Sequence, residues 1–264
     1  MVPVFDIFGK QISIYMLMAL AGILTIIFFG TKRAEKSGLD EFKMMYATLW
    51  AFAGTAIGGH IMYGISQFSS MIDFFKMLFG GDIKSFDKFL LGVKLVFGGS
   101  VFYGGLIGAI IAVAIYAKIA HIGSDYFDIG ACMVPLFHTF GRLGCFLTGC
   151  CYGVESKIGF VYKYSPDPLA NGVRRFPIQL VEATCNFLIF LLILYLLKKN
   201  KLKGRLFLLY LLIYTVIRFI LEFFRGDVIR GHFWVFSTSQ WISILLFIPA
   251  LILFIRLNKP KETE

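Results

Sequence analysis

Charged residues are scarce in this sequence: Asp, Glu, Lys and Arg together make up 16% of 264 residues, against about a quarter in a typical soluble domain. A low-complexity tract, a separable soluble segment and a convincing internal repeat are also missing, while 58% of the residues are hydrophobic. This composition excludes an ordinary soluble protein. It predicts an all-α, polytopic membrane protein in which residues 1–264 form a single integral membrane domain.

Other absences narrow the function. The formal net charge is +10, but no basic run is interleaved with stacking aromatics, so nucleic acid is not expected as a partner. Asp6 precedes the first apolar run and Lys10 is the only cation before it. A cleavable signal peptide has a positive region there, so we expect the first segment to remain as a helix of the mature protein. The missing repeat also argues against an inverted-repeat transporter.

Seven apolar segments approach the length of about 20 residues that a transmembrane helix needs. The fourth is the least hydrophobic and could be short, broken or partly re-entrant. The predicted crossings are residues 12–30, 43–66, 95–117, 127–148, 178–197, 204–224 and 239–257.

Loop charges predict the orientation of these crossings. The short loop 198–205 has five cations and no acidic residue, so the positive-inside rule places it in the cytoplasm. Alternation then makes the loops 67–94, 149–177 and 225–238 external. The N-terminus is expected outside and the C-terminus inside.

Residues 138–153 contain a permanent charge in an apolar segment. Arg142 would cost roughly 2.5–3.5 kcal/mol at membrane depth, so it needs a partner or a wet cavity. His138, Arg142 and Cys145 are spaced to share one face of a helix.

Two more segments carry polar groups at helical spacing. Glu222 can pair with either Arg218 or Arg225, as a packing pair or as part of a site. For Arg225, extension of the side chain to lipid headgroups is the alternative. Gln179 and Glu182 open the fifth helix three residues apart.

Four arginines are therefore expected at the outer half of the bundle. Arginine suits bidentate contact with phosphate, and a phospholipid headgroup is the phosphate available there. The residues alone suggest a lipid-binding cavity and leave catalysis open. The four are Arg142, Arg175, Arg218 and Arg225.

The cysteines and glycines are interpreted as structural residues. Cys145, Cys150 and Cys151 lack the paired spacing of structural zinc sites, so we predict packed or polar-lining thiols and no metal site, with a metal or a disulfide as alternatives. The Gly54/Gly58 and Gly104/Gly108 pairs have the spacing of closely packed helices. His60 and His121 are read as structural or interfacial.

Several motifs together resemble the prolipoprotein diacylglyceryl transferases, and the likeness runs in order through nearly the whole chain. The motifs are Phe102-Tyr-Gly-Gly-Leu-Ile-Gly108, Gly141-Arg-Leu-Gly144 followed by Gly153, Arg175-Phe-Pro-Ile-Gln-Leu-Val-Glu182, Arg218-Phe-Ile-Leu-Glu-Phe-Phe-Arg-Gly-Asp227 and Ser239-Gln-Trp-Ile-Ser243.

The resemblance implies a seven-helix enzyme of the bacterial plasma membrane. Such enzymes move the diacylglyceryl group of phosphatidylglycerol to the lipobox cysteine of a prolipoprotein signal peptide and release glycerol 1-phosphate. No cofactor is implied. The expected partners are this lipid, the prolipoprotein and the lipid bilayer.

Carried over by position, Arg142 and Arg225 would hold the phosphate and stabilise the leaving group. Tyr15 matches a first-helix tyrosine of the family, and Gly153 closes the arginine motif. The expected substrate-binding set is completed by Gly104, Arg175, Gln179, Glu182, Arg218 and Glu222.

This chain departs from the family at three positions. The family usually has a histidine, a candidate base, at the position of Tyr103, and a tyrosine with a pKa near 10 is a poor base at neutral pH. Cys145 and Cys150 stand where an asparagine and an acidic residue are typical. His138, one turn before Arg142, is the substitute base we predict, with a structural histidine as the alternative.

Two other functions remain open from the sequence. The first is a paralogue that uses the same lipid donor with a different acceptor. The second is a membrane protein that binds or transports lipid without catalysis.

Overall fold

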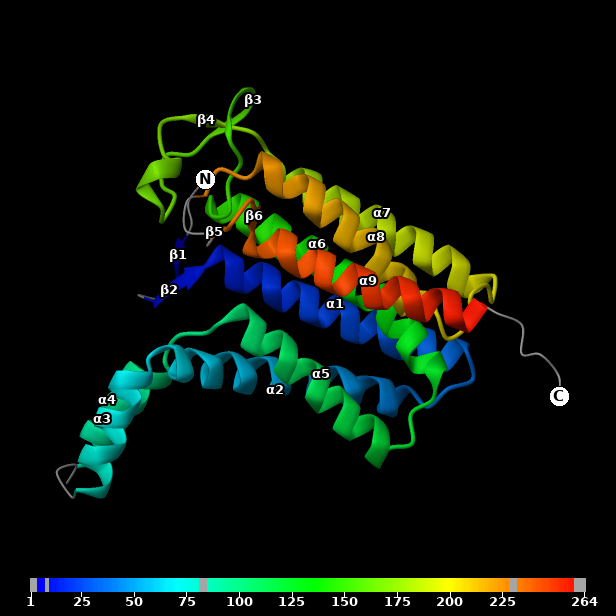
Figure 1. Cartoon of the computed structure of the whole chain (residues 1–264), viewed down its shortest axis with the longest axis horizontal. Coiled ribbons are helices and arrows are strands. Elements are labelled where there is room, and N and C mark those ends of the chain that lie inside the picture. The colour runs from blue at the N-terminus through cyan, green and yellow to red at the C-terminus, as the bar shows by residue number, and fades with distance from the viewer. Residues whose placement is uncertain (1–3, 8–9, 81–84, 228–231, 259–264) are drawn as a thin grey trace. The chain divides into compact units, whose positions relative to one another are not determined.

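The computed structural model describes residues 4–7, 10–80, 85–227 and 232–258. The chain divides into two compact units, and each is described by itself. The first consists of the residues up to Ser37 and those from Ser124 onward, and the second of Gly38–Gly123. Figure 1 shows the order of their helices and strands along the chain.

The first unit is a helical bundle centred on one helix. Helix α6 packs against α1, α7 and α8, and α9 packs against α8. The bounds are Ile14–Lys36 for α1, Ser124–Thr148 for α6, Ile178–Lys198 for α7, Leu206–Leu221 for α8 and Thr238–Asn258 for α9.

A row of small residues explains why α1 lies close to α6. Gly22, Ile26, Gly30 and Ala34 are the buried positions of α1 and recur every four residues, which places them on one face. A methyl group added at Gly22 would lie 2.9 Å from Phe140 Cβ on α6. Since side chains on that face would force the helices apart, the small residues determine this contact.

Helix α6 is continuous, so the expectation that this segment could be short, broken or re-entrant is wrong. It runs through Pro135 without interruption. Asp128, buried near its start, accepts hydrogen bonds from the backbone N–H groups of Gly204 and Leu206, at 2.5 and 3.1 Å. These bonds satisfy donors at the beginning of α8 and hold the basic turn between α7 and α8 against α6.

Short strands cover the other end of this bundle. Strand β3 (Glu155–Val161) pairs antiparallel with β4 (Arg174–Arg175), and the connecting segment contains the 3-10 helix η1 (Pro168–Ala170). A cluster of Phe146, Tyr152, Tyr162 and Ala170 forms a small core beneath them. The remaining pairs are β1 (Val4–Ile7) with β2 (Lys10–Ser13) and β5 (His232–Phe233) with β6 (Phe236–Ser237).

The second unit consists of two packed helices and a helical hairpin. Helices α2 and α5 pack along their length. A methyl group added at Gly58 would lie 2.9 Å from Gly108 Cα, which confirms the prediction that these glycines serve close packing. The bounds are Glu41–Ser66 for α2, Phe68–Phe79 for α3, Phe86–Phe97 for α4 and Phe102–Ile119 for α5.

Two predictions about this unit need correction. The segment 67–94 is not a plain loop, because α3 and most of α4 lie in it. The segment 95–117 is not one helix, because α4 ends at Phe97 and α5 begins at Phe102. His60 Nδ1 lies 2.7 Å from the carbonyl oxygens of both Phe97 and Gly99 at this break, so His60 has a structural contact.

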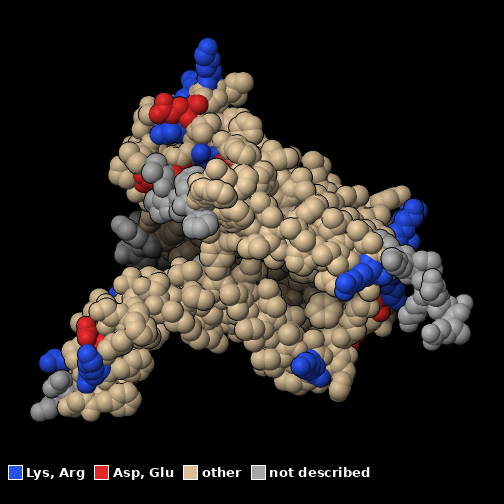
Figure 2. All heavy atoms as spheres, in the orientation of Figure 1, with Lys and Arg blue, Asp and Glu red and all other residues tan. Residues whose placement is uncertain are grey.

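Within the described part of the chain, five helices are long and apolar enough to cross a membrane: α1, α6, α7, α8 with its extension to Phe224, and α9. Their outer faces are apolar, with Phe28 68% and Leu245 65% exposed. Figure 2 shows uncharged surface along α7–α9 and charged residues at the ends of this unit. Helix α2 is not among the five, and the apolar part of α5, Tyr103–Ile119, is shorter. Seven crossings are therefore not established by length and composition.

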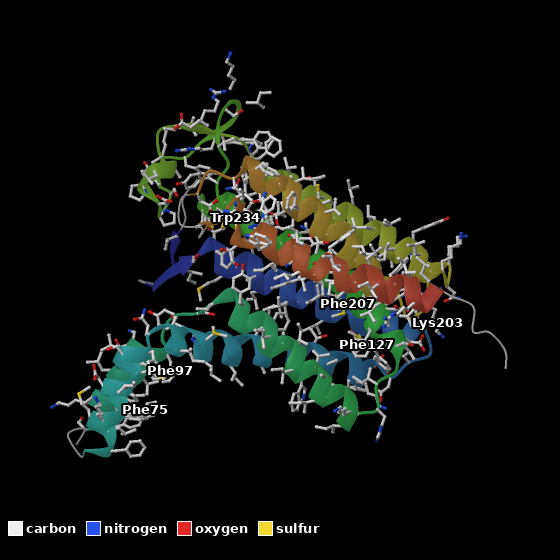
Figure 3. The ribbon with its side chains drawn as sticks, viewed as in Figure 1. Phe75, Phe97, Phe127, Lys203, Phe207 and Trp234 are labelled. Atoms are coloured by element: carbon white, nitrogen blue, oxygen red, sulfur yellow. The ribbon has the colours of Figure 1, made fainter. Side chains whose placement is uncertain are left out.

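The two ends of the first unit differ in chemistry. Lys203 lies in the basic turn between α7 and α8, and Trp234 lies at the opposite end, in the turn between β5 and β6 (Figure 3). Trp234 is 87% exposed. An exposed tryptophan beside apolar helices is typical of a membrane–water interface.

Candidate functional site: an arginine cluster around one carboxylate

The centre of the candidate site is Glu182, in the second turn of α7, with a side chain that is 1% exposed. Its Oε1 lies 2.9 Å from Nη2 of Arg142 on α6. Its Oε2 lies 4.0 Å from Nη1 of Arg218 on α8 and 3.8 Å from Nη1 of Arg225. Three arginines, one on α6 and two at the end of α8 and just beyond it, therefore meet at one buried carboxylate.

Arg218 has a second carboxylate partner one helical turn away. Its Nη2 lies 2.7 Å from Glu222 Oε2 and donates to Ser239 Oγ at 3.0 Å. The other oxygen of Glu222 accepts from Ser237 at 2.9 Å. Of the two pairings open to Glu222, the structure has the one with Arg218, which ties the end of α8 to the start of α9.

Arg225 is held by a fork to Asp227. Its Nε and Nη2 donate to the two carboxylate oxygens, each at 2.9 Å. Burial by itself would lower the pKa of Arg225, but the hydrogen-bonded Asp227 carboxylate outweighs it and raises the pKa. The side chain is 2% exposed, so the alternative in which Arg225 extends to lipid headgroups is wrong.

The cluster has unused donor capacity. The Nη1 atoms of Arg218 and Arg225 are buried and have no hydrogen-bond partner among the described residues. Glu182, at 4.0 and 3.8 Å from them, is beyond hydrogen-bond distance. Buried donors without partners are costly, so an incoming anion would be stabilised here.

An aromatic group lies next to Arg142. His138 Nδ1 is 3.3 Å from the Tyr210 hydroxyl, and its ring centroid is 5.2 Å from that of Tyr214. Tyr214 is also in electrostatic contact with Arg142. The predicted substitute base therefore lies one helical turn from Arg142, beside two tyrosines of α8.

Three other predicted residues lie at the end of the same unit that is opposite the basic turn around Lys203. Gln179 is fully buried, and its Nε2 donates to Cys150 O at 2.8 Å. Gly153 forms a backbone bridge with Arg225, and a methyl group there would lie 3.0 Å from Phe224 O. Tyr15 packs on Gly144 and is in electrostatic contact with Arg142. Gly153 thus allows the chain that carries Arg225 to approach.

Arg175 is engaged by other groups. Its Nη2 donates to Leu169 O at 2.5 Å, its guanidinium lies 4.8 Å from the Tyr152 ring centroid, and Glu155 is 3.8 Å away. Its partners belong to the β3–β4 region. The prediction of four converging arginines is therefore met by three of them.

Tyr103 and Gly104 lie at the start of α5, in the second unit. Gly104 packs on α2, since a methyl group there would lie 3.1 Å from the carbonyl carbon of Gly58. This contact accounts for Gly104 by packing. Roles in binding or catalysis for Tyr103 and Gly104 stay predictions.

Several residues of the network were not singled out from the sequence. Tyr210 and Tyr214 precede Arg218 at steps of four along α8, and Asn186 follows Glu182 at the same step on α7. This four-residue spacing could have predicted that they share a helix face with Arg218 or Glu182. No sequence pattern predicted the contact of Asp227 with Arg225, because it depends on the turn that follows η2 (Glu222–Phe224).

Comparison with known proteins identifies the family. The family model for prolipoprotein diacylglyceryl transferase matches residues 3–256. The chain belongs to this family. Among curated relatives, the phosphatidylglycerol–prolipoprotein diacylglyceryl transferase of Clostridium tetani is 33% identical over 252 residues, which is 95% of either chain. The protein named phosphatidylglycerol–prolipoprotein diacylglyceryl transferase 2 of Clostridium perfringens is 33% identical over 260 residues, covering 97% of this chain and 94% of the relative. The family and the apolar helices together make the chain a multi-pass membrane protein.

Proposed function

We propose that this chain transfers the diacylglyceryl group of phosphatidylglycerol to the lipobox cysteine of a prolipoprotein. The supporting observation is the meeting of Arg142, Arg218 and Arg225 at one buried carboxylate, with two Nη1 atoms that lack hydrogen-bond partners among the described residues. The matched family and the names of the relatives agree with this activity. A lipid phosphate is the anion that suits such donors.

The proposed setting is the bacterial cell membrane, with seven crossings and the arginine cluster in the outer half. The cluster lies at the ends of α6 and α8 and the beginning of α7, away from the basic turn around Lys203. The positive-inside rule puts that turn in the cytoplasm. The N-terminus would then be outside and the C-terminus inside.

The reaction exchanges one bond for another. A bond forms between the cysteine sulfur and the terminal glyceryl carbon of the diacylglyceryl group, and the bond from that carbon to the phosphate oxygen breaks. The leaving group is glycerol 1-phosphate, on which negative charge develops. Arg142 and Arg225 would stabilise that charge, because guanidiniums already fixed by Glu182 and Asp227 need little reorganisation.

The thiol proton must go to a base, and two residues are candidates. His138 lies one turn before Arg142 and contacts Tyr210. Tyr103 occupies the position where the family usually has histidine. We favour His138, since an imidazole accepts a proton near neutral pH far more readily than a phenol.

The test uses the purified full chain in vesicles that contain labelled phosphatidylglycerol, with a lipobox peptide added. We expect lipidated peptide and glycerol phosphate to appear in equal amounts. A peptide with serine in place of the lipobox cysteine is the control and should give neither product.

The other outcomes separate the alternatives. Release of glycerol phosphate without peptide modification would overturn the proposed acceptor and favour a paralogue with the same donor. Binding of the lipid without headgroup release for any thiol, hydroxyl or amine acceptor would overturn the enzymatic proposal.

A further inference from the structure

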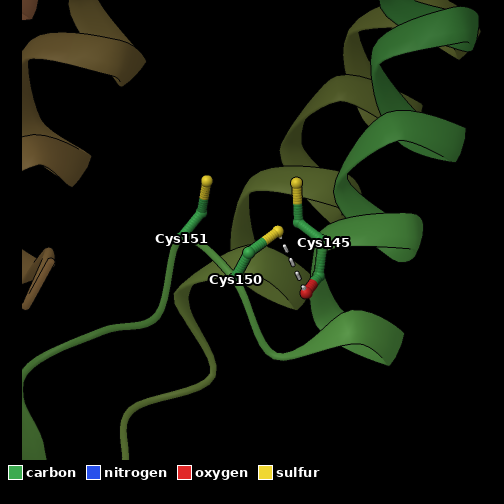
Figure 4. A group of neighbouring side chains, drawn as sticks. All are labelled: Cys145, Cys150 and Cys151. Atoms are coloured by element: carbon green, nitrogen blue, oxygen red, sulfur yellow. Dashed lines mark hydrogen bonds between the residues drawn. The ribbon is translucent and has the colours of Figure 1, made fainter. Parts of the chain in front are cut away.

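Three cysteine sulfurs gather at the end of α6. Cys145 is in the last turn of the helix, and Cys150 and Cys151 follow in the turn after it. Their Sγ atoms all lie within 4.8 Å of one another. Figure 4 shows the three side chains pointing into the same space from two sides. The structure has all three as free thiols.

The backbone of this turn is what brings the sulfurs together. Gly149 (φ 83°) and Cys151 (φ 56°) both adopt the left-handed conformation, which costs a non-glycine residue free energy. The N–H of Gly149 donates to Cys145 O at 2.9 Å and closes the helix. The chain therefore reverses tightly enough for Cys150 and Cys151 to face Cys145.

Contacts with other elements hold the turn in place. Gln179 Nε2 donates to Cys150 O at 2.8 Å, and Ser165 Oγ donates to Gly149 O at 2.9 Å. Cys145 is 7% exposed, and Cys150 and Cys151 are half-buried. The three sulfurs are thus largely positioned before any ligand arrives, and two of them are partly accessible.

The distances suit a small thiophilic ion. With Zn–S bonds of about 2.3 Å and tetrahedral angles, ligand sulfurs lie about 3.8 Å apart. A separation of up to 4.8 Å between the sulfurs therefore needs to close by about 1 Å. Rotation about χ1 in Cys150 and Cys151 can supply that movement, since both lie outside the helix.

The surrounding charges favour bound thiolates. Arg225 and Arg142 both interact electrostatically with Cys151. A divalent ion with three thiolates carries one net negative charge, and these guanidiniums are near enough to attract it.

We propose that Cys145, Cys150 and Cys151 form a three-thiolate site for one thiophilic metal ion of the zinc type, with the fourth coordination position open to water. Binding is a simple exchange in which the thiols release their protons to solvent as the metal–sulfur bonds form, so no oxidant is required. Soft thiolate ligands select Zn²⁺, Cd²⁺ or Cu⁺ over Mg²⁺ and Ca²⁺. The spacing along the chain predicted no metal site, and the arrangement in space leads to this different proposal.

The experiment titrates the reduced, purified full chain in detergent with Cd²⁺ and follows the ultraviolet charge-transfer absorption of cadmium thiolate. We expect saturation at one ion per chain and displacement by Zn²⁺. Cys145→Ser, Cys150→Ser and Cys151→Ser should each weaken binding by at least about tenfold. Cys185→Ala and Cys132→Ala, which remove cysteines outside the cluster, should leave binding unchanged.

A second measurement needs no variant and so does not depend on folding of the serine forms. Zn²⁺ should protect the three clustered thiols of the unaltered chain from alkylation, read by mass spectrometry of their peptides. Absence of a saturable cadmium signal, equal loss in the Cys185→Ala control, or alkylation unaffected by Zn²⁺ would each overturn the proposal. A disulfide between two of the three cysteines that resists the reductant would also overturn the proposal.

Discussion

Glu182 Oε1 lies 2.9 Å from Arg142 Nη2, and the other oxygen of the same carboxylate lies 3.8 Å from Arg225 Nη1. The two arginines most closely tied to the proposed phosphate site are thus both within ion-pair range of one acid. With Arg218 added, the cluster has three guanidiniums, and Glu182, Glu222 and Asp227 supply three carboxylates. The formal charges balance before any lipid binds.

Removing the central charge should therefore disturb the whole cluster. In Glu182→Gln the shape is kept, but the two buried guanidiniums of Arg218 and Arg225 and the half-buried one of Arg142 face only two carboxylates. Loss of one partner of a buried ion pair costs about 3–5 kcal/mol, so we expect a clear fall in the thermal midpoint in detergent together with loss of transferase activity.

The matched control is Glu155→Gln, which neutralises an acid whose side chain is 70% exposed and whose arginine is 3.8 Å away. Its effect on the midpoint should be small, because exposed pairs contribute little. An equal fall in both variants would contradict the central role of Glu182.

Arg142 and Arg225 should each be essential to turnover. We expect Arg142→Ala and Arg225→Ala to abolish activity, and Arg225→Lys to lower kcat by about 10²-fold or more. Lysine keeps the charge but cannot reproduce the two-donor fork to Asp227, so the remaining donors would be misplaced. The rates are measured with the labelled lipid and a lipobox peptide. Arg174→Ala, which removes an exposed arginine of β4, is the control and should retain activity.

The four most apolar of the long helices, α1, α7, α8 and α9, were predictable because a long apolar run is visible in the sequence. The predicted 178–197 and 239–257 differ from α7 and α9 by one residue at the ends. The hairpin of α3 and α4 was missed because Asp73, Lys76 and other charges made it resemble a loop, whereas both helices are short and amphipathic.

The candidate site, like the fold, was predictable from the sequence only in part. Arg218 and Glu222 pair at helical spacing, which a sequence displays directly. The contact of Arg142 with Glu182 joins helices whose residues are forty positions apart, and no spacing rule predicts it. The gathering of Cys145, Cys150 and Cys151 depends on the left-handed conformation at Cys151, a residue type that does not signal such a turn.

Tyr103 offers a test of the family's usual base position. We predict that Tyr103→His retains or increases activity at neutral pH, because an imidazole is a better proton acceptor than a phenol there. Tyr103→Phe, which removes the hydroxyl and keeps the ring, is the matched control. A Tyr103→His variant that is stable but inactive would contradict a role for this position as the base.

His138 is the sharpest prediction, because its contacts separate a base from a structural histidine. We expect His138→Ala to lose at least about 10²-fold in kcat, the usual contribution of a general base. Tyr210→Phe removes the hydroxyl that lies 3.3 Å from Nδ1 while keeping the aromatic ring. If His138 is the base, this variant should shift the lower limb of the pH–rate profile and keep its midpoint of thermal unfolding. A purely structural His138 would instead lower the midpoint in both variants and leave the profile unchanged. Full activity of His138→Ala would refute the proposal outright and leave Tyr103 as the candidate base.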